Sequence, residues 1–404
     1  MRILILADGL EGSSLSAPGR WLSSLAAHWM EAGHRVQVVC IHPLPSWQRP
    51  EDPPGVTVFR PKRQTFEAVL GEALAVDPDV VHVATAGPLG PRVVEALHEL
   101  PVLLDVHDFW PACPNDDLLR RPRLTACREH WPYQGCHGCA GAQRARAMEE
   151  RAELVAASRI IVARSDFHAL HLSATTGREV EVVPYGVDTR RFRPDPDPPQ
   201  AEDVLALYET RHLPRVLFMG PPTPARGADG LLDMLVALMA RLAEVELVVA
   251  GRDPANPAWG DVFVNETREL GLGDHVRVLP AVSAADLPAL YVSCPVAMSP
   301  LAAPDPGGLA ILEAMACGIP IVASPLGAVE ELLKQGEESL LIPAGEVPEF
   351  VTALWTMIAD PIARMAFGES ARMAAQERHE FGHTASRLEG LYRRLGSTPG
   401  RNVA

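Results

Sequence analysis

Short apolar runs alternate with helix-length segments along almost the whole chain, and this alternation limits the fold more than any other feature. The runs are almost continuously apolar, which is typical of strands that are buried on both faces of a parallel sheet. Strands joined through helices predict a sheet wrapped by helices. In the first half the predicted strands are residues 1–8, 35–40, 80–83, 102–106, 160–163 and 180–183.

The same alternation begins again after a break. A Pro-, Asp- and Arg-rich stretch runs from Pro184 to about Pro199, and a new strand with a glycine turn starts at Arg215–Gly220. The sequence therefore predicts an α/β protein of two Rossmann-like, doubly wound domains, residues 1–185 and 186–380, with the ligand in the cleft between them. Further strands are predicted near residues 245–250, 276–279, 296–299, 319–323 and 339–342.

The composition is that of a globular chain, and it excludes one class of partner. Of the 404 residues, 47% are hydrophobic and 22% are charged, and the formal net charge is −15. A protein that coats nucleic acid needs a broad excess of Lys and Arg, so we expect no nucleic-acid partner. Lys62 and Lys334 are the only lysines. The abundant Arg suits phosphate binding, although a GC-rich genome explains the same bias.

Neither an export signal nor a membrane span is predicted. The first eight residues are too soon acidic for a signal peptide and fit a buried strand. The most apolar later stretch, residues 231–251, contains four charged side chains and divides into a helix and a strand. Seven cysteines without an export signal indicate a reducing compartment, so we expect a cytoplasmic protein.

The segment 299–323 carries the most specific chemistry. A glycine pair, Gly307 and Gly308, follows a strand and opens a helix at Leu309. Two glycines allow backbone N–H groups at the positive end of a helix to approach an anion such as a phosphate. Glu313 lies further along, where its carboxylate can accept hydrogen bonds from two neighbouring hydroxyls, as in a ribose. A helix cap and a surface glutamate would explain either feature alone, but not the whole segment.

This segment resembles the donor-site pattern of the retaining glycosyltransferases of family four, Glu-Pro-Phe-Gly-Leu followed after three residues by Glu-Ala-Met-Ala-Cys-Gly. The resemblance extends to Gly33–Val36, to Pro184–Pro194 and to Phe381–Leu395. It implies the GT-B fold, with an acceptor-binding first domain and a donor-binding second domain. It also implies that the last helix, within residues 381–404, crosses back to the first domain.

Two positions depart from the family pattern. Asp305 stands where the family has the first of two glutamates, and the loop after Gly220 has Pro221 in place of an Arg and Arg226 in place of a Lys. The resemblance implies that Arg226 binds the donor diphosphate, together with the N–H groups near Gly307, Gly308 and Leu309. Asp305 would then contact the donor sugar, and Glu313 the ribose. One of the two phosphate cations is missing, which puts the activity in doubt more than the fold.

In the first domain, residues 105–114 resemble the His-Asp-x-Trp-x-x-Cys-Pro segment of one branch of the family. A lone histidine after a strand is usually structural, but the motif favours a functional role for His107. The resemblance implies that His107 contacts the donor sugar or the incoming acceptor. The opening loop, with Gly12 and Gly19 at its ends, would face the same cleft, and Gly19 is assigned to the donor site.

Four cysteines lie within a predicted insert over residues 110–142. Cys113, Cys127, Cys136 and Cys139 include one Cys-x-x-Cys pair, and four thiolates could close a tetrahedral zinc site that staples the loop. The spacing is not that of a standard zinc ribbon. Free thiols and an oxidisable pair therefore remain as alternatives to a structural zinc.

The resembled chemistry is the transfer of a sugar from a nucleotide-diphosphate sugar, such as a UDP- or GDP-sugar, to an acceptor hydroxyl with retention of anomeric configuration. Arg226 and the helix after Gly308 would stabilise the leaving diphosphate, so no catalytic metal or other cofactor is required. Pro221 and Asp305 also fit a non-catalytic nucleotide-sugar-binding subunit. A nucleotide-sugar epimerase is a weaker alternative.

The acceptor is not identified by the sequence, because fold does not fix specificity. A glycan, a lipid-linked saccharide and a small metabolite are all compatible with the sequence. An Arg-rich part of the insert could meet a phosphorylated acceptor or a membrane surface, although a solvated charged loop explains it equally well. These arginines are Arg120, Arg121, Arg123 and Arg128.

Overall fold

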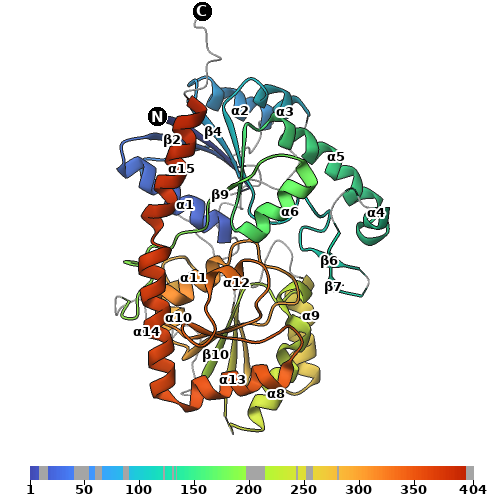
Figure 1. Cartoon of the computed structure of the whole chain (residues 1–404), viewed down its shortest axis with the longest axis vertical. Helices are drawn as coiled ribbons and strands as arrows, with labels where there is room; N and C mark the ends of the chain where they lie inside the picture. The colour runs from blue at the N-terminus through green and yellow to red at the C-terminus, as the bar shows by residue number, and fades with distance from the viewer. Residues whose placement is uncertain are drawn as a thin grey trace, which may run out of the picture.

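The structure is a computed structural model that describes residues 1–8, 17–40, 54–59, 66–84, 91–121, 123–129, 132, 134–196, 214–242, 244–251, 258–279 and 282–396. These residues form two α/β domains that face each other, with the last helices running along one side of both (Figure 1). The predicted fold class is confirmed.

The first domain contains a seven-stranded sheet in the order β3-β2-β1-β4-β5-β8-β9, and every neighbouring pair is parallel. Strand β1 is central because all but its first residue is buried, which the apolar run from Ile3 requires. The strands are β1 (Arg2–Ala7), β2 (Arg35–Cys40), β3 (Thr57–Phe59), β4 (Val80–Ala84), β5 (Val102–Asp105), β8 (Ile160–Ala163) and β9 (Glu181–Val182).

Helices cover this sheet because each presents one apolar face to it. In α1 the buried residues Trp21, Leu25 and Trp29 recur every four positions and pack in the core beside β1 and β2. An insert between β5 and β8 adds a short hairpin and a helix, β6 (Leu119–Arg120), β7 (Thr125–Ala126) and α4 (Gln134–Ala140). The other helices are α1 (Ala17–Glu31), α2 (Phe66–Leu74), α3 (Pro91–Leu97), α5 (Ala142–Ala157) and α6 (Asp166–Thr176).

The second domain contains a six-stranded parallel sheet in the order β12-β11-β10-β13-β14-β15. Its strands are β10 (Arg215–Met219), β11 (Glu246–Ala250), β12 (Val276–Leu279), β13 (Val296–Ser299), β14 (Ile321–Ala323) and β15 (Ser339–Leu341). Its α-helices are α8 (Leu231–Met239), α9 (Ala258–Glu269), α10 (Leu287–Val292), α11 (Leu309–Ala316), α12 (Ala328–Leu332), α13 (Val347–Ala359) and α14 (Pro361–Arg378).

Strand order decides where a ligand can bind. In the second sheet β10 lies between β11 and β13, so the chain leaves β10 in one direction and returns to its other side at β13. The loops after β10 and β13 therefore flank a crevice at the carboxyl ends of the strands, where open sheets bind ligands. The segments 220–227 and 300–308 are these two loops.

The last helix, α15 (Phe381–Gly396), returns to the first domain and packs against β4 and β5 (Figure 1). Leu388 and Tyr392 on its inner face are fully buried. The chain crosses between the domains beside the start of this helix, where the Thr384 hydroxyl donates to the carbonyl of Pro184 at 3.0 Å. The return helix thus belongs to the core of the first domain.

Several predicted strands are longer than the observed ones, and two elements were not predicted. The strand expected from residue 319 begins at Ile321, since Pro320 has no N–H to donate to the sheet. Strand β3 and the β6–β7 hairpin were not predicted from the sequence.

Within the described ranges, no single helix combines the length and apolarity of a membrane span. Helices α13 and α14 reach that composition only together, and they meet at a bend of 99°.

Candidate functional site

The amino end of α11 is closed by a carboxylate of its own loop. Gly308 adopts a φ of 63°, a left-handed conformation that favours glycine. Asp305 Oδ1 accepts hydrogen bonds from the N–H groups of Gly307 at 2.9 Å and of Gly308 at 2.5 Å. These are the N–H groups predicted to meet a donor phosphate, and a carboxylate there is stabilised by the helix end. The site is therefore built for an anion, and Asp305 supplies one.

Arg226 lies over the glycine turn that follows β10. Gly220 has a φ of 122°, and a Cβ at this position would lie 3.0 Å from the Cδ and Nε atoms of Arg226. The Arg226 side chain lines one small cavity together with Asp305, Gly308 and Tyr291. The two loops therefore bring the predicted phosphate cation to the predicted phosphate-binding helix end.

Glu313 is buried and forms an ion pair across the domain interface. Arg20 Nη2, from α1 of the first domain, lies 3.1 Å and 3.2 Å from the two Glu313 carboxylate oxygens. The Tyr291 hydroxyl donates to Glu313 Oε2 at 2.9 Å. Gly19 was predicted at the end of the opening loop, but it lies beside Arg20 in the first turn of α1. Gly12 lies outside the described residues. The carboxylate that is predicted to bind the ribose is thus already paired with a guanidinium and a phenol.

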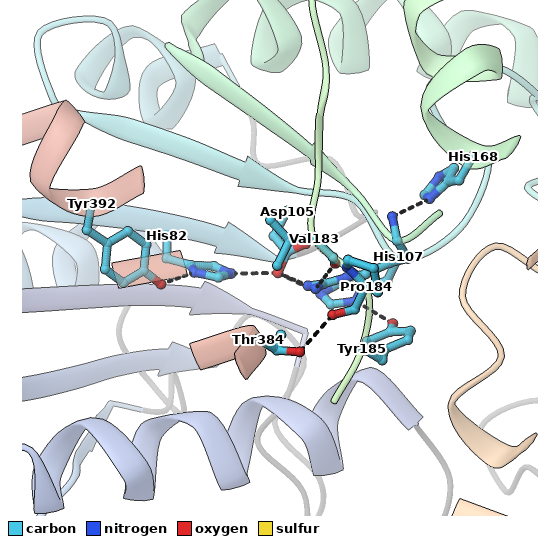
Figure 2. Close-up of polar contacts among 10 residues, drawn as sticks. His82, Asp105, His107, His168, Val183, Pro184, Tyr185, Thr384 and Tyr392 are labelled. Atoms are coloured by element: carbon cyan, nitrogen blue, oxygen red, sulfur yellow. Dashed lines mark hydrogen bonds and ion pairs between the residues drawn. The ribbon is translucent and has the colours of Figure 1, made fainter. Parts of the chain in front are cut away.

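His107 is half-buried as a residue, with its side chain 8% exposed, and faces Tyr185 (Figure 2). Its Nδ1 lies 2.6 Å from the Tyr185 hydroxyl, the two rings stack, and its Nε2 lies 3.5 Å from Asp105. Burial, with the Arg164 charge nearby, lowers the pKa of His107 to about 3 although Asp105 acts in the opposite direction. His107 is therefore a neutral imidazole that can exchange hydrogen bonds but cannot serve as a cationic acid at neutral pH.

A chain of buried polar groups connects this histidine to the last helix. His82 lies between Asp105, at 3.0 Å from its Nε2, and Tyr392 of α15, at 2.5 Å from its Nδ1 (Figure 2). Arg164 is fully buried, pairs with Asp105, and donates to the Val183 carbonyl at 3.1 Å. The network fixes the end of β5, and with it the position of His107.

The two domains touch at a glycine. A Cβ at Gly307 would lie 2.6 Å from the Tyr185 ring and 2.7 Å from Arg164 Cβ, so only glycine permits this approach. The cavity beside Arg226 measures about 20 Å³ and the cavity beside Glu313 about 30 Å³. Each holds roughly one or two water molecules. Neither cavity has room for a nucleotide as the described residues stand.

Comparisons with known proteins place this geometry in a family. The sequence profile described as "Glycosyltransferase Family 4" matches residues 19–191, and that described as "Glycosyl transferases group 1" matches residues 208–374. The chain belongs to glycosyltransferase family 4. It is thus a glycosyltransferase by both domains, which confirms the family predicted from the segment around Glu313.

Individual relatives are distant. The GDP-mannose-dependent alpha-(1-6)-phosphatidylinositol monomannoside mannosyltransferase of Mycolicibacterium smegmatis is 28% identical over 52% of this chain. The match spans 56% of that relative, little more than half its length.

Two of the solved structures that resemble this one each cover 98% of the chain. One is sucrose-phosphate synthase of Thermosynechococcus elongatus, with a TM-score of 0.74, 19% identity and 99% of that chain covered. The other is Anabaena HepE in complex with UDP-glucose, with a TM-score of 0.71, 17% identity and 100% of that chain covered. At these identities the structures show the fold alone, which is GT-B.

The structure brings together most of the predicted donor residues of this glycosyltransferase. These residues form one cluster around α11. Leu309 and Glu313 line the same cavity. Sequence reasoning missed Arg20, Tyr291 and Arg164. A buried-face arginine in an amphipathic helix was the one available signal for Arg20, because a charge at that position needs a partner.

The four cysteines of the insert line one small cavity. Cys139 Sγ accepts hydrogen bonds from the Arg121 N–H at 3.1 Å and the Asn115 amide at 3.4 Å, while burial raises the pKa of the Cys113 thiol. Among the described residues, no three Cys, His, Asp or Glu side chains are arranged to hold a metal ion. Zinc binding by Cys113, Cys127, Cys136 and Cys139 stays a prediction of the sequence.

A buried histidine of this network provides a pH test. His168 Nδ1 accepts a hydrogen bond from the backbone N–H of Arg164 at 3.2 Å, and its Nε2 lies 2.8 Å from the carbonyl oxygen of Asp108. The neutral ring is therefore the form that fits both contacts. Burial lowers the pKa of His168 from 6.5 to about 3. The unfolded chain then takes up a proton that the folded chain refuses, and stability falls as the pH drops below about 6.5.

We expect His168→Gln, whose carboxamide can make both contacts, to remove about 2 kcal/mol of the stability change between pH 7.5 and pH 5. Urea unfolding of both proteins at the two pH values measures this difference. The exposed His98→Gln is the control and should behave as the unaltered protein. An unchanged pH dependence in His168→Gln would contradict the neutral assignment.

Proposed function

We propose that this protein is a cytoplasmic retaining glycosyltransferase that moves a sugar from a nucleotide-diphosphate sugar to an acceptor hydroxyl. The observation that supports the proposal most is the convergence of Arg226, Asp305, Gly308 and Glu313, from two loops and one helix, at the carboxyl edge of the second sheet. The relative from M. smegmatis is named for GDP-mannose, and HepE was solved with UDP-glucose, so both donor types are candidates.

The chemistry follows from where charge develops. When the bond between the anomeric carbon and the diphosphate breaks, negative charge grows on the leaving phosphate oxygens. Arg226 and the N–H groups at the start of α11 would stabilise that charge. The diphosphate would then replace the Asp305 carboxylate, which accepts hydrogen bonds from these N–H groups in the structure. The acceptor hydroxyl attacks from the same face, and its proton leaves with the diphosphate. The neutral His107 and Tyr185 would bind sugar hydroxyls and not transfer protons.

Domain opening precedes donor binding in this proposal. Separation of the domains would move Arg20 away from Glu313 and free its carboxylate for the ribose hydroxyls. Closure over the bound donor would then exclude water, which limits wasteful hydrolysis. A non-catalytic nucleotide-sugar-binding subunit remains the second candidate, because Pro221 leaves the phosphate loop with one cation.

A screen of UDP-, GDP- and ADP-sugars by thermal shift, followed by NMR of the product, tests the proposed reaction. We expect one donor to raise the melting temperature and its sugar to be transferred with retained anomeric configuration. Transfer should continue in excess EDTA, since protein groups supply the positive charge. An inverted product, or complete loss of transfer in EDTA with the protein folded, would contradict the mechanism, and donor binding without turnover would favour the binding subunit.

The leaving-group role of Arg226 gives the sharpest kinetic prediction. Arg226→Ala should lower kcat/KM by about 10²- to 10⁴-fold, because about 3–5 kcal/mol of transition-state stabilisation is lost when a charge partner is removed from a phosphate site. Pro221→Arg, which restores the second cation, should raise activity or donor affinity. The matched control is Arg241→Ala, an exposed arginine after α8, which should leave turnover unchanged. Unchanged turnover in Arg226→Ala on a confirmed donor would disprove the role.

A further inference from the structure

A cavity of about 400 Å³ lies between the insert of the first domain and the phosphate loop of the second. This volume is within the range of small-molecule sites, roughly 300–1,000 Å³, and far exceeds the closed cavities beside Arg226 and Glu313. The insert stands above α9 where the two domains face each other (Figure 1). The cavity therefore has room for a small molecule, which the two cavities of the predicted donor site lack.

The floor of this cavity is part of the donor site. Thr223, Pro224 and Ala225 line it, and the next residue along the chain is Arg226. The Ala225 carbonyl accepts hydrogen bonds from the N–H groups of residues 302 and 303, both at 3.0 Å, in the loop that leads to Asp305. A molecule in the cavity would thus lie against the loops that are proposed to hold the donor phosphates and sugar.

Among the arginines that line the cavity, Arg144 has no carboxylate of the described residues at ion-pair distance, although its charge also acts on Asp116. Arg121 pairs with Asp117 at 2.6 Å, and Arg151 pairs with Asp116 at 2.9 Å. Arg144 donates to a neutral group, the Asn115 carbonyl oxygen, at 2.8 Å. Within the described part of the chain no carboxylate forms an ion pair with Arg144. Three guanidinium groups against two carboxylates favour a ligand that carries an anionic group.

The remaining lining suits a polyol or sugar. The amide of Asn115, which is 8% exposed, is held by Cys139 Sγ at 3.4 Å, so this wall is fixed before any ligand binds. The carboxylates and the Thr223 hydroxyl provide hydrogen-bond partners for ligand hydroxyls. Trp259 at the start of α9 contributes a large aromatic surface from the opposite domain, and it is 39% exposed.

We propose that this cavity is the acceptor site, and that it takes a polyol or saccharide bearing a phosphate group, which Arg144 binds. The assignment rests on the proposed glycosyltransferase function. The phosphate can belong to a soluble sugar or polyol phosphate or to a lipid headgroup, and both present the same chemistry to Arg144. The ion pairs of Arg121 and Arg151 orient the insert, while Arg144 contacts the ligand.

The test compares acceptors that differ only in the phosphate. myo-Inositol 1-phosphate and glucose 6-phosphate are assayed against myo-inositol and glucose, and vesicles with phosphatidylinositol provide the lipid arm. We expect a phosphorylated compound to be used with a KM about 10- to 100-fold below its neutral counterpart. Use in solution assigns a soluble acceptor, and use only in vesicles assigns a lipid-linked one.

Arg144→Met, which keeps the aliphatic bulk, should raise the KM for the phosphorylated acceptor about 10- to 100-fold and abolish the preference over the neutral compound. Its nucleotide affinity and donor hydrolysis should not change. Trp259→Ala should raise the KM for both compounds alike. Arg159→Met, an exposed arginine just after α5 and outside the cavity, is the matched control and should have no effect.

An unchanged KM in Arg144→Met would overturn the assignment. So would use of no phosphorylated compound while the donor is hydrolysed. Failure of the proposed function looks different, because then no nucleotide sugar binds or is hydrolysed by the unaltered protein, and the acceptor assignment fails together with it.

Discussion

The buried carboxylate of Glu313 joins the two domains and is also the predicted contact of the donor ribose. It is paired with Arg20 from the first domain and with Tyr291 from its own. Removal of one partner from a buried ion pair typically costs about 3–5 kcal/mol, because the other charge is left without compensation. The closed arrangement therefore persists until something replaces Arg20, and the ribose of a nucleotide is the replacement that the family resemblance implies. If Glu313 binds the ribose as proposed, donor binding and domain opening are coupled through this one side chain.

Asp305 follows the same logic at the start of α11. With one methylene fewer than the family's glutamate, its carboxylate turns back onto the N–H groups of Gly307 and Gly308. The N–H groups at this helix end thus bind an anion from the chain itself. A donor diphosphate in the same place would be bound by these N–H groups and also by Arg226. Gly307 is also in close contact with Tyr185 of the first domain. The predicted phosphate site and His107 therefore come together only when the two domains are in contact.

The fold could be predicted, and the residues of the candidate donor site could be identified, because their signals are local. Continuous apolar runs identify buried parallel strands, and a glycine pair before a helix identifies an anion site whatever the rest of the chain does. Arg20 could not be predicted, because its partner lies 293 residues away and depends on how the domains dock. The same holds for His107, whose burial against Tyr185 results from the crossing of the chain between domains. The residue was identified from its motif, but its neutral state required the packing around it.

Calorimetric titration of UDP, GDP and ADP measures most directly whether Glu313 serves the donor. We expect one of these diphosphates to bind, and Glu313→Gln to weaken it roughly 10- to 100-fold, since a charge-assisted hydrogen bond to the ribose is lost. The exposed Glu330→Gln is the matched control and should bind as the unaltered protein does. Equal affinity in Glu313→Gln with an intact fold, or no binding of any of the three by the unaltered protein, would contradict the assignment of this cleft as a nucleotide-sugar site.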